Sequence, residues 1–166
     1  MKKLYILLIL LILPMSGCGY SFLSEVNTLP VKTIWVKTFE NRTDEPDAGK
    51  IMTEMLNSRL ISNKRISLAN KDKAAAFLEG IVKDIKITHI AFDKNGTTTR
   101  DRVLLTVSFR LISNKKVIRK GDNMVEFEDY DAGAAPSVTA NNKQEAIKRA
   151  ADKMAGDIIN YIFINF

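Results

Sequence analysis

The stretch that decides the fold spans residues 77–112 and reads FLEGIVKDIKITHIAFDKNGTTTRDRVLLTVSFRLI. Its second half, 102–112, carries an apolar side chain at every second position, which is the period of a strand with one buried face. The tripeptide KNG at 94–96 precedes this half, and Asn and Gly accept the left-handed backbone of a tight turn. We therefore predict a long β-hairpin whose first arm is 77–92.

The first arm of this hairpin changes phase along its length. Leu78 and Val82 belong to one face, whereas Ile85 and Ile87 follow the opposite parity. A strand can absorb such a change by accommodating one extra residue, which bends the strand and restores the buried face. The sequence therefore predicts a β-bulge near Lys83.

Weaker signals on both sides of the hairpin predict the remaining elements. Two segments carry apolar stripes at helical spacing, and three carry β-forming residues. The predicted elements are a strand at 31–39, a helix at 47–61 capped by Asp47, a short strand at 65–68, a strand at 117–127 interrupted at Gly121-Asp122, and a last helix capped by Asn141 or Asn142. This order predicts an α+β fold, a two-layer sandwich with two helices packed on one face of a mostly antiparallel β-sheet.

The N-terminus has the pattern of an export signal. Two lysines precede an apolar run at 4–13, and Pro14 and small residues follow. The run has about half of the roughly twenty residues that a membrane-spanning helix needs. We therefore predict a signal peptide at 1–17, a short tether at 18–30 and a single domain at 31–166.

The end of this signal resembles the lipobox of bacterial lipoproteins, with the sequence MSGC at 15–18. In that resemblance Cys18 becomes the first mature residue and carries acyl chains such as palmitate, which would anchor the protein to a membrane. The alternative is an ordinary buried cysteine. Gly19 stands where an Asp would favour the inner membrane, so the expected location is the outer membrane of a Gram-negative cell envelope, on its periplasmic side.

Composition excludes several other classes of protein. The chain has 166 residues, a formal net charge of +6, one cysteine and one histidine. One cysteine and one histidine cannot build a disulfide framework or a Cys/His zinc site, and they argue against a Cys-His catalytic pair. We therefore expect no cofactor, no metal and no enzymatic activity. His89 is expected to be a packed strand residue without a catalytic group around it, and the export signal argues against a nucleic-acid partner.

Taken together, these residues resemble the LptE family of lipopolysaccharide-assembly lipoproteins. The matching positions are Cys18-Gly19-Tyr20, Leu29-Pro30, Ile34, Val36, Phe39, Asn41, Thr43, Glu45-Pro46, Leu78-Glu79-Gly80, Lys94-Asn95-Gly96 and the last helix. The strand followed by F-x-N-x-T also occurs in other periplasmic modules, namely the TolB N-terminal domain and CsgG-like and LpoB-like lipoproteins. An activator or assembly scaffold of that kind is the alternative interpretation.

The resemblance implies a binding and scaffolding role without covalent chemistry. Members of the family plug the LptD β-barrel, assist its assembly and contact lipopolysaccharide through basic residues. Lys94 matches a basic residue that the family has at the hairpin turn. A second basic position of the family falls near Ala140 here, where Lys143 is the nearest cation. The tether at 19–30 spans at most about 40 Å, which favours a partner in the same membrane.

Basic residues in and after the hairpin are the candidate ligand contacts. Residues 81–120 hold ten Lys or Arg against three acids. The candidate lipopolysaccharide-binding residues are Lys94, Arg100 and Arg102, and a secondary basic patch consists of Lys115, Lys116, Arg119 and Lys120. The alternatives are a solvated hairpin end for the first group, and for the second, pairing with the acidic segment 121–131. The apolar C-terminal segment 158–166 is expected to be mainly helix core, with Phe163 or Phe166 available for contact with a barrel or lipid.

Overall fold

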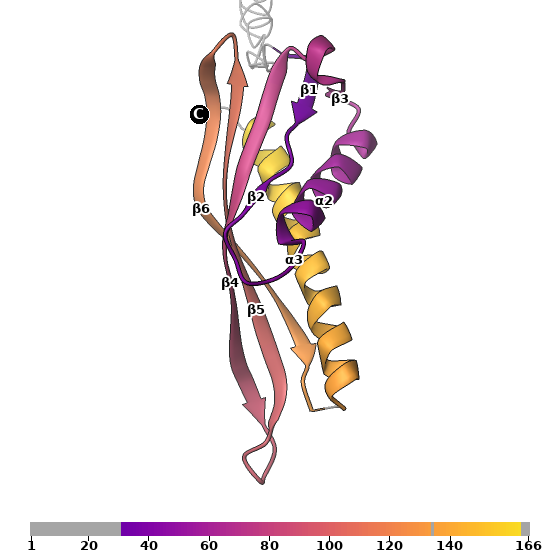
Figure 1. Ribbon diagram of the computed structural model, residues 1–166, viewed down its shortest axis with the longest axis vertical. Coiled ribbons are helices and arrows are strands. Elements are labelled where there is room, and N and C mark those ends of the chain that lie inside the picture. Colours follow the sequence, from indigo (N-terminus) through magenta and orange to yellow (C-terminus); the bar gives the residue numbers. More distant parts are fainter. Residues whose placement is uncertain (1–30, 134, 164–166) are drawn as a thin grey trace, which may run out of the picture.

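The computed structural model describes residues 31–133 and 135–163 of the chain (Figure 1). The predicted signal peptide and tether, with Cys18, lie outside the described residues. The elements in chain order are β1 (Thr33–Val36), β2 (Glu40–Asn41), α2 (Ala48–Ser62), β3 (Ser67–Leu68), the 3₁₀ turn η2 (Lys71–Lys73), β4 (Ala76–Phe92), β5 (Thr98–Ser113), β6 (Lys116–Asp131) and α3 (Pro136–Phe163).

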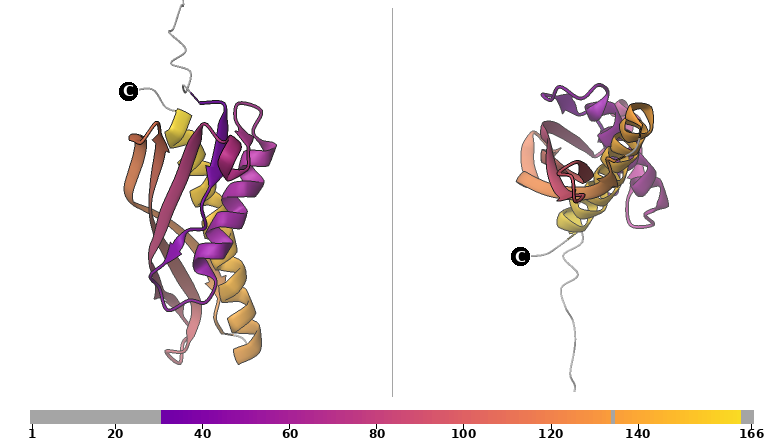
Figure 2. Two further views of the ribbon diagram at one scale, coloured as in Figure 1. Left: turned by 45° about the horizontal axis from the view of Figure 1, so that its top comes forward. Right: turned by 90° about the horizontal axis from the view of Figure 1, so that it is seen from below.

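The strands form one mixed sheet in the order β3-β1-β4-β5-β6, with β2 also paired to β4. The long strands β4, β5 and β6 pair antiparallel through two hairpins. The short strands β1 and β2 run parallel to β4, and β3 runs parallel to β1. Figure 2 shows both helices on one side of this sheet. The predicted α+β sandwich of two helices on a mostly antiparallel sheet is confirmed.

The predicted hairpin and its bulge are both present. The β4–β5 pairing passes from Val82 opposite Val107 to Asp84 opposite Thr106, so Lys83 is the extra residue. Beyond the bulge, Ile85 lies opposite buried Leu105. The bulge therefore returns the apolar residues of β4 to the face that the helices cover.

Both helices bury apolar stripes against this face of the sheet. The side chains with no more than 1 % of their surface exposed include Met52, Leu56 and Leu60 of α2, Met154, Ile158 and Ile162 of α3, and Leu78, Val107, Phe109 and Leu111 of the sheet. The main core runs from Val31 to Ile162 and draws on both helices and the long strands. Since this segment carries its own core, we expect it to fold without residues 1–30.

The first helix starts at Asp47 as predicted but without a side-chain cap, and the last helix starts earlier than predicted. Asp47 has the left-handed φ of 58° and makes no side-chain cap; its backbone carbonyl accepts the Ile51 N–H instead, at 2.8 Å. The last helix begins at Pro136, five residues before Asn141, because proline at the first helical position has a preset φ and no N–H to satisfy. Asn142 caps nothing; its side-chain amide donates to the carbonyl of Asp131 at 2.9 Å.

The strand boundaries also differ in detail. The predicted strand at 31–39 is shortened to β1, and the separate two-residue β2 follows it at Glu40–Asn41. The predicted strand at 117–127 extends to Asp131, and Gly121-Asp122 is a bulge within it. The Asn123 N–H, at a left-handed residue with φ 52°, donates to the Ser108 hydroxyl at 2.9 Å, which holds the bulge closed.

Candidate functional site

The predicted site lies at the free end of the β4–β5 hairpin, which projects beyond the other strands (Figure 1). The Asp93 carboxylate accepts the backbone N–H groups of Asn95 and Thr97 at 2.8 and 2.9 Å. Gly96 supplies the left-handed φ of 79° that the turn requires. This rigid turn presents Lys94, whose side chain is exposed and makes no ion pair within the described residues.

Arg100 and Arg102 lie behind the turn on the sheet face that the helices leave open. Arg102 makes two hydrogen bonds to the Asp129 carboxylate at 2.6 and 3.0 Å, and its guanidinium lies 4.4 Å from the Phe127 ring centroid. These hydrogen bonds lower the pKa of Asp129 and raise that of Arg102. Arg100 lies 3.6 Å from Asp131 and is exposed. Of the three predicted cations, Lys94 is therefore the most available for a ligand, and Arg102 is the most committed to β6.

The hairpin end also exposes apolar side chains that the sequence analysis missed. Phe92 is 58 % exposed and Ile90 38 % exposed. Ile90 has no partner in the ladder because the register shifts between His89 and Ala91. The sequence carries a signal for this exposure: after Ile87 the apolar residues change parity a second time, at Ile90 and Phe92. Cationic and apolar groups thus lie together at this end, as an anionic lipid would require.

The secondary basic patch does not form one surface. Lys115 lies in the β5–β6 turn, and it and Asn114 have the positive φ values of a tight hairpin turn. Arg119 is half-buried and donates to the neighbouring Ile118 carbonyl at 2.7 Å. Lys120 pairs with Asp122 at 3.3 Å, as the alternative interpretation expects. This turn and the Lys94 turn lie at opposite ends of β5, which has 16 residues and is about 50 Å long.

Lys143 is also committed to an internal contact. Its ammonium hydrogen-bonds the Glu45 carboxylate at 2.5 Å, and the Lys143 side chain is only 29 % exposed. This pair ties α3 to the segment between β2 and α2. Lys143 therefore serves packing in this structure and does not join the hairpin end.

His89 differs from the prediction in two respects. Its side chain is 62 % exposed, and its Nδ1 lies 2.6 Å from Oδ1 of Asp101, so an acidic partner is present. Asp101 is 6 % exposed and also accepts the Tyr130 hydroxyl at 3.2 Å. This short polar chain holds β4, β5 and β6 together next to the hairpin end.

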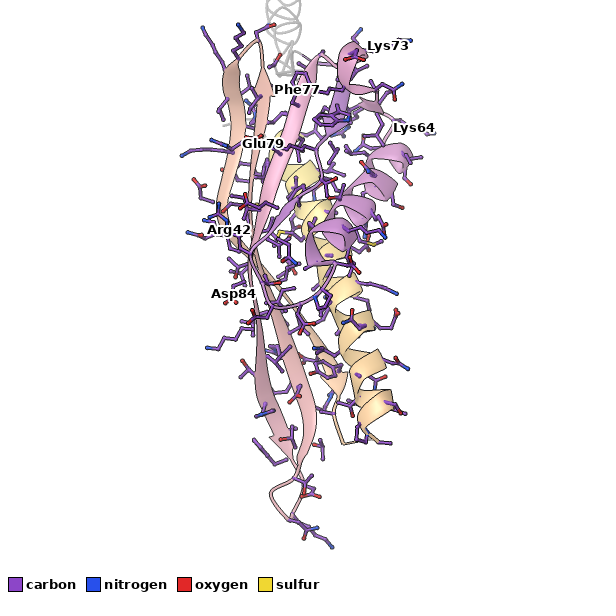
Figure 3. The ribbon with its side chains drawn as sticks, in the orientation of Figure 1. Arg42, Lys64, Lys73, Phe77, Glu79 and Asp84 are labelled. Atoms are coloured by element: carbon purple, nitrogen blue, oxygen red, sulfur yellow. The ribbon has the colours of Figure 1, made fainter. Side chains whose placement is uncertain are left out.

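A hollow of about 420 Å³ lies on the open face of the sheet, beside β2 and at the level of Glu79, which Figure 3 labels. Charges of both signs line it and satisfy one another in part: Arg110 donates to Glu79 at 2.7 Å. The Lys83 ammonium donates to the Asn123 side chain at 2.7 Å. This mixed lining offers no concentration of one charge to an ionic ligand.

Within 31–133 and 135–163, no helix is both long and apolar enough to span a membrane. The same residues contain no group of three or more His, Cys, Asp or Glu that could hold a metal ion.

Residues 31–162 match the family model of LptE, described as lipopolysaccharide-assembly. The chain belongs to the LptE family. The match covers both helices and every strand of the structure, so the family resemblance and its expected fold are confirmed. LptE-family membership makes this a lipopolysaccharide-assembly protein. No curated protein matches the chain.

Solved structures similar to this LptE-family chain share its fold at low identity. Rare lipoprotein B from Shewanella oneidensis has a TM-score of 0.54 at 13 % identity, covering 76 % of this chain and 91 % of the other. Lipoprotein B from Nitrosomonas europaea has a TM-score of 0.54 at 14 % identity, covering 84 % and 87 %. The PelC dodecamer from Paraburkholderia phytofirmans has a TM-score of 0.52 at 14 % identity, covering 81 % and 89 %.

Proposed function

We propose that the mature protein is lipidated on Cys18, resides on the periplasmic side of the outer membrane, and plugs and helps assemble an LptD-like β-barrel. In this role it takes part in inserting lipopolysaccharide and performs no covalent chemistry. The observation that carries the proposal is the match to the LptE family over residues 31–162. A fold shared at low identity with other lipoproteins would not by itself distinguish this role from that of another assembly scaffold.

The open face of the sheet is the surface that we assign to the barrel. Val125 is 52 % exposed and Phe127 49 % exposed. They are paired with Thr106 and Leu104 of β5, and all four side chains are on the sheet face away from the helices. Both helices cover the other face (Figure 2). A sheet face with aromatic and aliphatic side chains and no covering layer suits contact with another protein.

The hairpin end is the surface that we assign to lipopolysaccharide. Lipid A and its core carry phosphates and carboxylates, with which Lys94 and Arg100 can make charge-assisted hydrogen bonds. Phe92 and Ile90 supply adjacent apolar surface for acyl chains. The rigid Asp93 turn keeps these groups in place before the ligand arrives.

Purification from the native outer membrane tests the barrel partner. We expect tagged, lipidated protein extracted in detergent to recover an LptD-like barrel in stoichiometric amount, identified by mass spectrometry. Val125→Asp should reduce this recovery severalfold because it puts a charge on the assigned face. The matched control is Ile61→Asp on α2, where Ile61 is 75 % exposed. Recovery of a cell-wall synthase in place of a barrel would favour the activator alternative and overturn the plug assignment.

A binding measurement tests the hairpin end. We expect the double variant Lys94→Gln, Arg100→Gln to bind lipopolysaccharide about a hundredfold more weakly, since each lost charged hydrogen bond contributes about 1.5 kcal/mol or more. Lys37→Gln, Lys86→Gln removes the same charge from exposed positions elsewhere and should bind normally. Unchanged affinity of the hairpin variant, with an unchanged circular dichroism spectrum, would refute the assignment. Arg102 is left intact because its loss would also free Asp129.

A further inference from the structure

The end of the molecule opposite the Lys94 turn gathers five chain segments, and we call it the tether end because described residues begin there at Val31. It comprises the start of β1, the α2–β3 link, η2, the start of β4 and the β5–β6 turn. The Thr33 hydroxyl contacts the Lys73 carbonyl at 3.5 Å and accepts the Ala75 N–H at 3.0 Å. The Ser113 hydroxyl donates to the Ala75 carbonyl at 2.9 Å, which brings the β5–β6 turn alongside.

The tether end is strongly cationic. Figure 3 shows Lys64 and Lys73 on neighbouring segments at this end. Its seven exposed cationic residues are Lys32, Lys64, Arg65, Lys71, Lys73, Lys115 and Lys116. Asp72 is the one acid within these segments, and none of the seven cations makes an ion pair with a described residue. The field at this end is therefore strongly positive, because Asp72 offsets only one of the seven cationic charges.

Several cations elsewhere on the protein form ion pairs with carboxylates. Arg59 on α2 pairs with Asp152 on α3 through two hydrogen bonds. Arg149 and Lys153 on α3 both pair with Glu128 on β6. The lateral surfaces thus balance many of their charges internally. The seven cations at the tether end repel one another, and this repulsion is unfavourable unless an anionic partner neutralises their charge.

Two of the seven cations lie over aromatic rings at this end. The Arg65 guanidinium is 5.5 Å from the Phe163 ring centroid, and the Lys71 ammonium is 5.7 Å from that of Trp35. Trp35 in turn meets Phe77 edge to face, with 5.9 Å between centroids. Aromatic rings beside Lys and Arg are typical of surfaces that meet the headgroup layer of a membrane.

We propose that the tether end binds the anionic headgroups of glycerophospholipids in the membrane that holds the chain. This contact goes beyond the proposed function, which assigns no role to this end. Residues 18–30 span at most about 45 Å, so an anchor at Cys18 would keep Val31 near the leaflet surface. Tethering raises the effective concentration of headgroups around the seven cations. Lys115 and Lys116, predicted as part of a secondary lipopolysaccharide patch, belong to this face.

The contact would orient the protein before it meets a barrel. Because the two turns lie at opposite ends of the long strands, docking of the tether end points the Lys94 turn away from the membrane surface. The acyl anchor limits only the distance between the protein and the membrane, whereas several headgroup contacts also fix the tilt of the protein relative to the membrane surface. The hairpin end, which we assign to lipopolysaccharide, would then stand about 50 Å from the leaflet on the periplasmic side.

Vesicle flotation of residues 19–166, which lack the anchor cysteine, tests the proposal separately from lipidation. The vesicles contain equal parts of phosphatidylglycerol and phosphatidylethanolamine, or phosphatidylcholine alone. We expect binding to the anionic vesicles alone, weakening as salt is raised. The triple variant Lys64→Gln, Lys73→Gln, Lys115→Gln should partition about a hundredfold more weakly, since each lysine near an anionic surface contributes about fivefold.

The matched control removes the same charge from exposed positions away from this end, with Lys37→Gln, Lys50→Gln and Lys86→Gln. Its partitioning should change less than about threefold. The hairpin variant Lys94→Gln, Arg100→Gln should lose lipopolysaccharide while keeping the anionic vesicles, so the two surfaces can fail independently. Failure of the parent chain to bind anionic vesicles, or equal losses in the triple variant and its control, would overturn the proposal.

Discussion

Gly80→Ala is expected to destabilise the domain by about 3 kcal/mol, at the upper end of the usual cost of overpacking a core. A β-carbon at Gly80 would lie 2.2 Å from Cε1 of Phe39 and 2.6 Å from two further atoms of that ring. The Phe39 side chain is only 3 % exposed, so its ring has no solvent to move into. The strand position would otherwise favour alanine over glycine.

Phe39 cannot retreat as a unit because α2 fixes its backbone. The Phe39 N–H donates to the Thr53 hydroxyl at 2.9 Å, and that hydroxyl donates to the Gly49 carbonyl at 2.7 Å. A β-carbon at Gly49 would lie 2.2 Å from the Phe39 carbonyl oxygen, so the helix already touches this segment. The ring is therefore held between α2 and β4, and glycine at residue 80 makes room for it.

Urea denaturation measures this loss of stability. Combining the larger residue at 80 with a smaller one at 39 tests whether the Phe39 ring causes it. Phe39→Leu alone should cost about 1 kcal/mol or more, but together with Gly80→Ala the loss should be smaller than the sum of the two. The control Gly156→Ala adds a β-carbon on α3 whose nearest neighbour is 3.9 Å away, and it should stabilise by up to about 1 kcal/mol. A Gly80→Ala protein as stable as the parent would refute the packing argument.

The arrangement of β4 and β5 was predictable because one buried face imposes a period of two on both strands. Even the bulge at Lys83 follows from Leu78 and Val82 having the opposite parity to Ile85 and Ile87. The start of α3 was missed for a different reason. Asn141 and Asn142 are good capping residue types, but Pro136 with its preset φ had already begun the helix, and Asn142 bonds to β6 instead.

The position of the candidate site was predictable from the sequence, but the ion pairs that its side chains make were not. The sequence places Lys94 at the turn because Asn95-Gly96 fixes where the chain reverses. It does not show that Asp129 lies opposite Arg102, because that pairing depends on the register of β6 and its bulge. Lys143 is similar: its partner Glu45 is far away in the sequence, and only the packing of α3 brings the two together.

Alkaline pH is expected to unfold the protein partly through Tyr130. This side chain is 6 % exposed, and its hydroxyl donates to the Asp101 carboxylate at 3.2 Å. Burial, and then the charge of Asp101, raise the pKa of Tyr130 from 10.0 to about 12. Both effects penalise the phenolate, which in the folded state would face a carboxylate inside the core.

The sign of the effect follows from the proton balance. Below pH about 10 the phenol is neutral in both states, so the full stability is present. Between about pH 10 and 12 the unfolded chain releases this proton while the folded protein keeps it, and stability falls as the pH rises. Two pKa units correspond to about 2.7 kcal/mol, which is the full loss, reached once the pH exceeds about 12.

Denaturation of the parent and of Tyr130→Phe across this range isolates the contribution. Phenylalanine cannot ionise, so the variant should be less stable near neutral pH, where the hydrogen bond to Asp101 is missing, and should lose less stability on going to pH 12. Other tyrosines and the lysines titrate in both proteins, so the difference between the two curves reports Tyr130 alone. Parallel curves would mean that this phenol ionises as easily in the fold as in the unfolded chain, and that the polar chain from His89 through Asp101 is open to solvent at its inner end.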